Sequence, residues 1–257
     1  MSTSSDGSEA AFKDHFSGQA ATYSMFRPTY PATLFEWLAA ASPRRGRVWD
    51  AGTGSGQAAG GLAEHFQLVV GTDASAAQVA EAAPHRRVEY RVAPAEASGL
   101  PAGWADLVTV AQALHWFDIP RFFEEARRVL APDGLLAVWC YGDPRLDEPA
   151  VDRIVHGYNR GTVEPYWPRE RDLVLAAYGT VPFPFREIGT PSLSMEATWT
   201  LPQLAGYLRS WSATARYANV LGRDPIDAVE AELRQAWGPP EAARVIHWPL
   251  TVRAGRP

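Results

Sequence analysis

The sequence predicts an α/β fold in which helices cover both faces of a mainly parallel sheet. Between residues 47 and 141, apolar strand-like runs alternate with helix-like runs, and a glycine-rich turn follows the first strand. Strands that alternate with helices in this way form βαβ units, whose parallel strands are buried on both faces. The hydrophobic fraction of 46% is sufficient for a sizeable core.

The expected elements follow from the apolar runs and from the residues that interrupt them. A first helix spans residues 32–41, and Asp118 is placed to cap a later one. In the alternating region we expect helices near residues 55–66, 75–82 and 119–130, and strands near 47–51, 68–72, 88–92, 106–111 and 135–141. Beyond that region we expect a strand at 183–198, helices at 201–213 and 225–237, and a final strand at 245–252.

Composition divides the chain into parts of a single domain, residues 11–257. The small polar residues 1–10 are expected to be disordered. We expect an N-terminal cap at residues 11–42 and a ligand-binding core at 43–142. A lid-like helical insertion rich in proline and aromatic residues follows at 143–182, and the last strands and helices occupy 183–257.

The most informative segment joins the first expected strand to the helix after it. Asp50 precedes three glycines at every second position, Gly52, Gly54 and Gly56, and the next strand ends in Asp73. Glycine lets the backbone adopt a positive φ and approach a ligand closely, because it has no Cβ. An acid at the end of the second parallel strand can accept hydrogen bonds from two ribose hydroxyls. The unit therefore predicts a site for a cofactor that contains a nucleoside.

The spacing of the glycines distinguishes among such cofactors. A G-x-G-x-x-G fingerprint would indicate NAD, and Gly-Lys-Ser/Thr would indicate a phosphate-binding loop; neither occurs here. Asp50-x-Gly52-x-Gly54-x-Gly56 resembles the loop of class I methyltransferases, which use S-adenosylmethionine (SAM) and release S-adenosylhomocysteine (SAH). The resemblance implies that Asp50 is an acceptor near the amino acid end of SAM, that the glycine backbone lies against the cofactor, and that Asp73 binds the ribose.

Further segments resemble the small-molecule subgroup of these enzymes that includes trans-aconitate methyltransferase. They are the Tyr23 region with Arg27-Pro28-Thr29-Tyr30-Pro31, the block from Trp104 to Asp118, and residues 201–213. The resemblance covers nearly the whole chain, less closely over residues 143–182. It implies a Rossmann-like class I methyltransferase fold with a seven-stranded, mainly parallel sheet and a helical cap.

One segment departs from the family pattern. After the third strand many relatives place an acid before a small residue, where the acid binds the adenine amino group, and this chain has Pro94 there. We expect a backbone N–H near Ala95 to meet the adenine ring. Glu96 either assists this contact or begins a surface helix.

His115 is the main candidate for a polar catalytic role. It follows the fourth expected strand, at the sheet edge where the cofactor is expected, and histidine titrates near neutral pH, which suits proton removal. The alternative is a histidine that packs under the lid without touching the acceptor. Trp116 is a candidate wall of the site, and Gln112 is a candidate for a hydrogen bond to the cofactor or to the next loop.

Other residues are candidates for the acceptor pocket. Arg27 offers a bidentate fork to a carboxylate of the acceptor or of SAM, unless it is an ordinary surface residue. Tyr23, Tyr30 and Trp167 are candidate walls or parts of a lid, although core packing is the simpler explanation for each taken singly. Such a lid would exclude water from the reaction.

Composition disfavours several other classes of protein. A net charge of −5 gives no general attraction for nucleic acid or anionic membranes. One cysteine allows no internal disulfide, and the six scattered histidines lack metal-ligand spacing, so no metal is expected. Without a run of 18 apolar residues or a signal-peptide pattern, the default expectation is a cytoplasmic protein. The oligomeric state, monomer or homodimer, stays open.

Together these observations and the resemblance predict a SAM-dependent methyltransferase of a small organic molecule, with a carboxylate oxygen favoured as acceptor by family analogy. O- or N-methylation of a secondary metabolite is the nearest alternative. A protein that binds SAM without catalysis, or an inactive partner of another methyltransferase, is an alternative of a different class. The glycine spacing disfavours a nicotinamide oxidoreductase.

Overall fold

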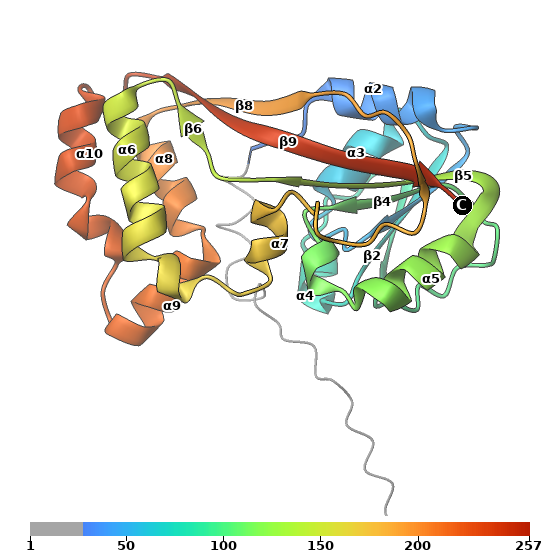
Figure 1. Cartoon of the computed structure of the whole chain (residues 1–257). Coiled ribbons are helices and arrows are strands. Elements are labelled where there is room, and N and C mark those ends of the chain that lie inside the picture. The colour runs from blue at the N-terminus through green and yellow to red at the C-terminus, as the bar shows by residue number, and fades with distance from the viewer. Residues whose placement is uncertain (1–27) are drawn as a thin grey trace, which may run out of the picture.

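The computed structural model describes residues 28–257, which form one mixed sheet with helices packed against it (Figure 1). The strand order is β3-β2-β1-β4-β5-β9-β6, with β7 and β8 also paired to β9. Neighbouring strands among the first five are parallel. These strands are β1 (Arg47–Ala51), β2 (Leu68–Asp73), β3 (Val88–Val92), β4 (Ala105–Ala111) and β5 (Leu130–Tyr141). They lie where the sequence predicts them, although β5 already begins at Leu130.

The other side of the sheet is antiparallel and centres on β9 (Arg244–Arg256). This strand pairs with β5 and with β8 (Leu193–Trp199). The short strands β6 (Arg145–Leu146) and β7 (Arg186–Glu187) add two-residue pairings to β9. Within the described residues the sheet therefore has nine strands where the resemblance implied seven, and the two additional strands are these short segments.

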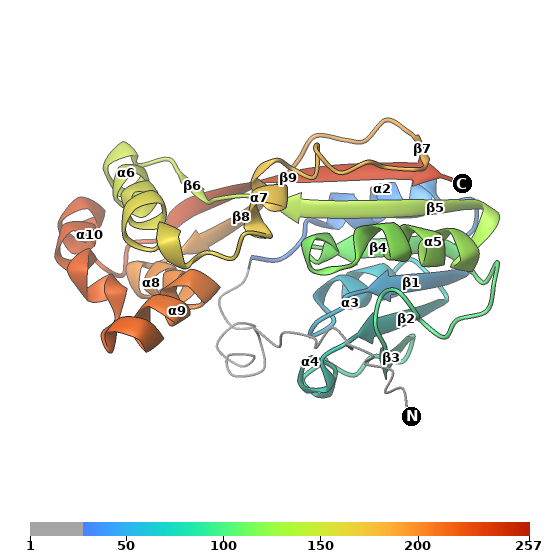
Figure 2. The same cartoon turned by 60° about the horizontal axis from the view of Figure 1, so that its bottom comes forward.

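Helices cover both faces of the parallel strands (Figures 1 and 2). Residues of α2 (Ala32–Ala41) and α3 (Gln57–Ala63) belong to the core on one face, and residues of α5 (Ile119–Val129) belong to the core on the other. Successive residues of β1 alternate between the two cores, with Val48 in the first and Trp49 in the second. The α/β fold class expected from the sequence is confirmed.

Asp118 caps α5 as expected. Its Oδ1 accepts a hydrogen bond from the Arg121 backbone N–H at 3.3 Å. The short helix α4 (Ala76–Ala80) has a similar cap, since the Ser75 hydroxyl accepts from the backbone N–H of Gln78. These caps satisfy N–H groups that have no partner inside the helix.

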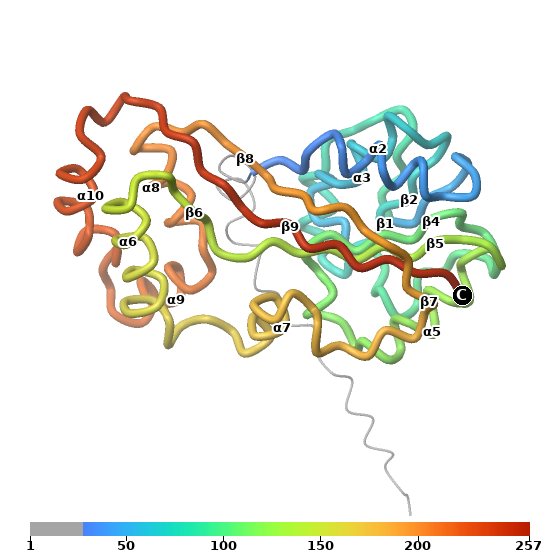
Figure 3. The backbone as a smooth tube through the Cα atoms, turned by 45° about the horizontal axis from the view of Figure 1, so that its top comes forward, coloured from blue at the N-terminus to red at the C-terminus, as the bar shows by residue number. Residues whose placement is uncertain are grey.

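A lobe of four helices lies at one end of the molecule, beyond the parallel strands (Figure 1). It consists of α6 (Pro149–Gly157), α8 (Leu201–Arg209), α9 (Ser212–Leu221) and α10 (Glu230–Trp237). The fifth helix of this half, α7 (Arg171–Leu175), lies between the lobe and the parallel strands (Figure 3). Across residues 28–257, none of the helices is long and apolar enough to cross a membrane.

The helix expected at residues 201–213 is divided between α8 and α9. The hydroxyl of Ser210 donates to the Tyr207 carbonyl at 2.6 Å, in competition with the regular helical hydrogen bond. The strand expected at 183–198 is interrupted as well, because Pro191 lies between β7 and β8 and has no N–H for strand pairing.

Candidate functional site

The turn between β1 and α3 contains glycines in left-handed backbone conformations. The φ angles of Gly52, Gly54 and Gly56 are 67°, 55° and 86°. A Cβ on Gly56 would lie 2.1 Å from the Tyr90 hydroxyl oxygen, and one on Gly52 would lie 2.7 Å from the Cβ of Ala113. The loop therefore requires glycine at these two positions for its backbone conformation and for space.

Asp73 lies at the end of β2 and fixes the glycine loop. Its Oδ2 accepts a hydrogen bond from the Gly54 backbone N–H at 2.9 Å, and its Oδ1 accepts from the Ser75 N–H at 2.8 Å. A carboxylate has about four acceptor positions on its two oxygens, so these bonds are compatible with further donors such as ribose hydroxyls. The structure thus joins Asp73 to the glycine motif by a direct hydrogen bond.

Asp50 lies beneath the loop and is fully buried. Its Oδ2 accepts from the Thr53 hydroxyl and its Oδ1 from the Thr109 hydroxyl, each at 2.7 Å. Burial raises the pKa of Asp50 to about 6, although the two hydroxyl donors act in the opposite direction. The carboxyl group therefore connects the loop to β4, and it needs little stabilisation from a nearby cation to be ionised at neutral pH.

The segment after β4 passes directly beside the glycine loop. A Cβ on Gly52 would lie 2.9 Å from the ring of Phe117, so this ring borders the loop as the side chain of Ala113 does. Glu96 contacts the same segment, because its Oε1 accepts from the Asp118 N–H at 2.7 Å. Ala95, next to it, is buried in the core on the α5 side of the sheet. Glu96 therefore bonds the segment that borders the loop, and Ala95 precedes it in the core.

Gln112 holds the ends of β4 and β5 together. Its side-chain Oε1 accepts from the Tyr141 N–H at 2.8 Å, and its Nε2 donates to the Tyr141 carbonyl at 3.2 Å. Its φ of 55° is unusual for a residue other than glycine. The partner of Gln112 is therefore the end of strand β5, which is neither of the two contacts considered from the sequence.

His115 lines a pocket and has a buried partner. Its Nδ1 lies 2.9 Å from the hydroxyl of Tyr178, and its ring packs on Trp116 with centroids 4.7 Å apart. Tyr178 is 1% exposed and follows α7 in the chain. Sequence reasoning missed this partner, because the two residues are far apart in the chain.

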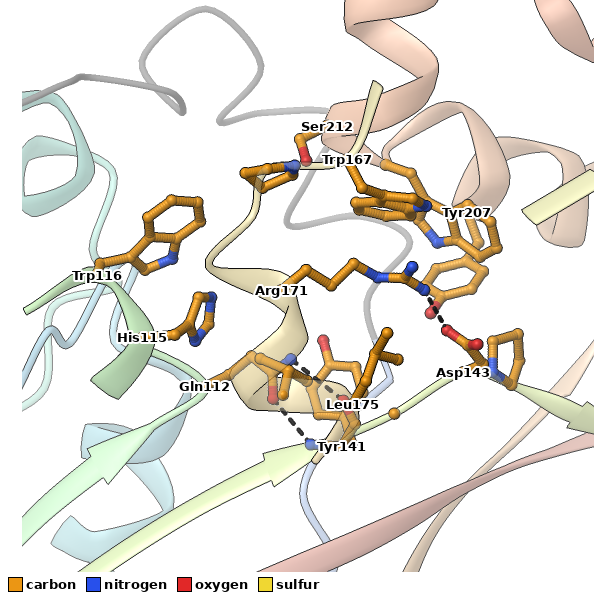
Figure 4. Close-up of a pocket in the computed structure, with 15 residues that line it drawn as sticks. Gln112, His115, Trp116, Tyr141, Asp143, Trp167, Arg171, Leu175, Tyr207 and Ser212 are labelled. Atoms are coloured by element: carbon orange, nitrogen blue, oxygen red, sulfur yellow. Dashed lines mark hydrogen bonds and ion pairs between the residues drawn. The ribbon is translucent and has the colours of Figure 1, made fainter. Parts of the chain in front are cut away.

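The pocket lies between the ends of β4 and β5, the helix α7 and the helical lobe (Figure 4). Its volume is about 110 Å³. The lining includes Gln112, His115, Trp116, Tyr141, Asp143, Trp167, Arg171, Leu175, Tyr207 and Trp211. Since residues 112–117 border the glycine loop as well as this pocket, the loop and the pocket lie on two sides of one segment.

Comparisons with known proteins agree with this arrangement. Residues 49–138 match the family model of a methyltransferase domain. A Dictyostelium discoideum protein named as a methyltransferase is 33% identical over 229 residues, covering 88% of this chain and 87% of that protein. The chain belongs to the class I SAM-dependent methyltransferases.

Two further relatives extend the comparison. A Saccharomyces cerevisiae protein named as the SAM-dependent methyltransferase CRG1 is 28% identical over 173 residues, covering 63% of this chain and 60% of that protein. The solved structure of an Anaeromyxobacter dehalogenans protein described as a type II methyltransferase has 45% identity and a TM-score of 0.85, covering 90% of this chain and 98% of the other. The methyltransferase fold therefore extends well beyond the matched domain.

The residues at the loop fit the cofactor of the methyltransferases, SAM. The glycine turn offers backbone without side chains, and Asp73 offers carboxylate oxygens at the end of β2. SAM carries a cationic sulfur and an amino group, and the two acidic residues of the loop, Asp50 and Asp73, suit that positive charge.

Three candidates in the N-terminal part of the methyltransferase have different outcomes. Tyr23 and Arg27 lie outside the described residues. Tyr30 packs edge-on against Trp139 with ring centroids 5.6 Å apart, and it approaches Tyr141 at 6.5 Å. Tyr30 therefore contacts a residue of the pocket wall while it contributes to the core.

The methyltransferase pocket also contains an arginine that sequence reasoning missed. Arg171, at the start of α7, forms an ion pair with Asp143, and its guanidinium lies 4.0 Å from the ring centroid of Trp167. In the sequence it belongs to the charged run Arg169-Glu170-Arg171-Asp172, which is typical of a solvated helix start. Only the proximity of Asp143 and Trp167 in the folded chain indicates a buried cation.

Proposed function

We propose that this methyltransferase methylates a small organic acceptor bound in the pocket behind residues 112–117, with a carboxylate oxygen as the favoured acceptor. One observation carries the proposal: the segment that borders the glycine loop also lines the pocket. A cofactor held at the loop and an acceptor held in the pocket would then meet at this segment. Methyl transfer requires such proximity, with reacting atoms about 3–3.5 Å apart and aligned.

The chain's own residues would bind and orient the cofactor and the acceptor, and they would exclude water from the site. Asp73 and the backbone of Gly52, Gly54 and Gly56 hold the nucleoside end of the cofactor, and Asp50 supports the loop from below. When bound, SAM supplies a methyl group already activated on a positively charged sulfur, so the protein need not create the electrophile. Trp116 and Trp167 contribute aromatic walls that keep water from the acceptor, and Tyr30 packs against Tyr141 of the lining.

The acceptor decides whether His115 is needed. A carboxylate is already nucleophilic, so its methylation releases no proton and requires no general base. A hydroxyl or amine acceptor would lose a proton, which Nε2 of His115 can take if Nδ1 keeps its hydrogen toward Tyr178. The contact between His115 and Tyr178 therefore favours O- or N-methylation of a secondary metabolite as the second candidate function.

The resemblance to the trans-aconitate methyltransferase subgroup supports a small acidic acceptor, and the adenine contacts of Ala95 and Glu96 remain part of this proposal. The glycine loop with Asp50 and Asp73 is also compatible with a protein that binds SAM without catalysis. A screen of small acids, phenols and amines with methyl-labelled SAM tests the proposal directly. Transfer to at least one class supports an enzyme, whereas SAH binding by calorimetry without any transfer supports a binding protein.

A further inference from the structure

Among residues 28–257, Arg171 of the pocket and the neighbouring Arg160 share a partly buried acidic partner, Asp143. Nη2 of Arg171 pairs with Oδ1 of Asp143, and Nη2 of Arg160 lies 3.1 Å from Oδ2 of the same carboxylate. The other acid beside Arg160 is Glu164, which is 3.9 Å away and has a side chain that is 53% exposed. Solvent screens such an exposed contact. Within the described residues, two guanidinium groups thus share one partly buried carboxylate, so this cluster carries an excess of positive charge.

The guanidinium of Arg171 is held in a fixed orientation. Asn159, which is 1% exposed, accepts hydrogen bonds at Oδ1 from Arg171 Nη2 at 3.3 Å and from Trp167 Nε1 at 2.9 Å. The stacking on Trp167 fixes the plane of the group. Among residues 28–257, the hydrogen bonds of Arg171 to Asp143 and Asn159 both use Nη2, so its Nε and Nη1 remain available as donors.

Besides these polar partners, the pocket around this cation includes several apolar side chains. Its side chain is only 12% exposed, and Trp211, Leu175 and Pro144 line the same pocket. Burial lowers the pKa of Arg171, which shows that its charge has lost hydration that Asp143 only partly replaces. Figure 4 shows the guanidinium pointing toward Asp143 and away from His115 and Trp116.

We propose that Arg171 determines acceptor specificity by binding a carboxylate, and that the acceptor is a small acid with one negative charge and an apolar body. The single charge matches the excess positive charge of the cluster, and the apolar body matches the aromatic lining. A guanidinium forms short, charge-assisted hydrogen bonds to a carboxylate, and Nε or Nη1 of Arg171 can donate such a bond. This inference rests on the proposed function, because it assigns the occupant of the same pocket.

The same contact would favour release of the product. When a carboxylate oxygen takes the methyl group, an O–CH₃ bond forms, the S–CH₃ bond breaks, and its electron pair stays on sulfur. The acid becomes a neutral ester without release of a proton. Because the ester carries no charge to pair with Arg171, it binds more weakly than the acid.

Calorimetric titration with 3-phenylpropanoate and with its methyl ester tests the inference without requiring turnover. Both titrations are performed with and without saturating SAH. We expect the acid to bind at least about tenfold more tightly than the ester, in line with a charge-assisted hydrogen bond. Succinate, which lacks the apolar body, is expected to bind at least about tenfold more weakly than 3-phenylpropanoate because less apolar surface is buried.

Three variants separate recognition from folding. Arg171→Gln should bring the ratio of acid to ester affinity close to one, whereas Arg169→Gln, which removes the same charge from an exposed neighbour, should leave it unchanged. Asp143→Asn should keep the preference for the acid, because the cation remains. If Arg171 only stabilised the fold, Arg171→Gln would weaken both ligands alike and leave the ratio as it was.

The outcomes also separate this inference from the proposed function. Equal binding of acid and ester by the parent, an unchanged ratio in Arg171→Gln, or no binding of the acid at millimolar concentration would overturn the role of Arg171. Methyl transfer to neutral acceptors would then still support the proposed function. Failure to bind SAH, or failure to methylate any acceptor, would instead contradict the proposed function.

Discussion

The hydroxyl of Tyr178 lies 2.9 Å from Nδ1 of His115 and connects the segment after α7 to the segment after β4. Burial holds the pKa of Tyr178 well above its usual value, so the hydroxyl is neutral. For His115 to take a proton at Nε2, Nδ1 must carry the other hydrogen and donate it to the Tyr178 oxygen. The tyrosine therefore controls whether this histidine can serve as a base.

His115→Ala should distinguish the two kinds of acceptor. We expect it to leave methylation of a carboxylate nearly unchanged and to reduce methylation of a hydroxyl or amine about a hundredfold, the usual contribution of a general base. Turnover numbers for matched acid and phenol acceptors measure this difference. Tyr178→Phe should reduce the turnover number for the phenol about tenfold and leave that for the acid nearly unchanged, because it removes the partner of Nδ1. His156→Ala, at an exposed position, is the control and should have no effect.

Asp73→Asn should weaken cofactor binding specifically. Asparagine keeps one acceptor oxygen for the loop but loses the charge and the second acceptor. The dissociation constant of SAH should rise about ten- to a hundredfold, as expected for the loss of hydrogen bonds to a charged group. Calorimetry measures this constant, and Glu89→Gln, an exposed change on β3, should leave it unaltered. Wild-type affinity in Asp73→Asn would show that Asp73 serves only the loop.

Gly56→Ala and Gly60→Ala form a matched pair within one loop and helix. The first introduces a Cβ at a φ of 86° and 2.1 Å from the Tyr90 hydroxyl oxygen, so we expect a loss of at least about 1–2 kcal/mol in the free energy of unfolding. The second adds a Cβ in α3, where no described atom beyond the nearby backbone of the helix itself lies within 4 Å, and alanine there should add about 0.5–1 kcal/mol. Urea denaturation gives both values, and equal effects would contradict the argument.

The parallel half of the fold and the cofactor loop were accessible from the sequence because their signals are local. Strand and helix patterns alternate there, and the three alternating glycines after Asp50, followed by Asp73 at the end of the next strand, leave few structural alternatives. The φ angles confirm left-handed conformations at those glycines, and the hydrogen bond from Gly54 to Asp73 joins the two parts of the motif. The pairing of Asp50 with Thr109 could not be predicted, because it depends on the register between β1 and β4.

The pocket that we propose for the acceptor was much harder to predict from the sequence. Its cation, Arg171, meets Asp143 and Asn159 only because the chain between β5 and α7 folds back on itself. Sequence reasoning assigned the anion-binding role to Arg27, which lies outside the described residues. Trp167 and Trp116 were identified as candidate walls from residue type alone, and the structure places both in the lining of one pocket.

The buried carboxyl of Asp50 predicts two pH dependences. Its folded-state pKa of about 6 is above the unfolded value, so protonated Asp50 favours the folded state at low pH. That contribution is fully present below about pH 4 and is lost as the pH rises through about 6. Asp50→Asn has no such titration, and asparagine can still bond both threonine hydroxyls. Urea denaturation should therefore show the variant gaining stability relative to the parent between about pH 4 and 6, with no further change above.

Cofactor binding should follow the opposite trend in the parent. The amino group of SAH is a cation, and a cation near the loop favours ionised Asp50, so binding releases a proton below about pH 6. The parent's affinity for SAH, measured by calorimetry, should fall as the pH drops below about 6, whereas Asp50→Asn should bind more weakly and with little pH dependence in that range. A parent affinity that stays constant from about pH 5 to 7 would mean that the charge of Asp50 does not contribute to binding. Asp50 would then act only through its bonds to Thr53 and Thr109, which hold the glycine loop against β4.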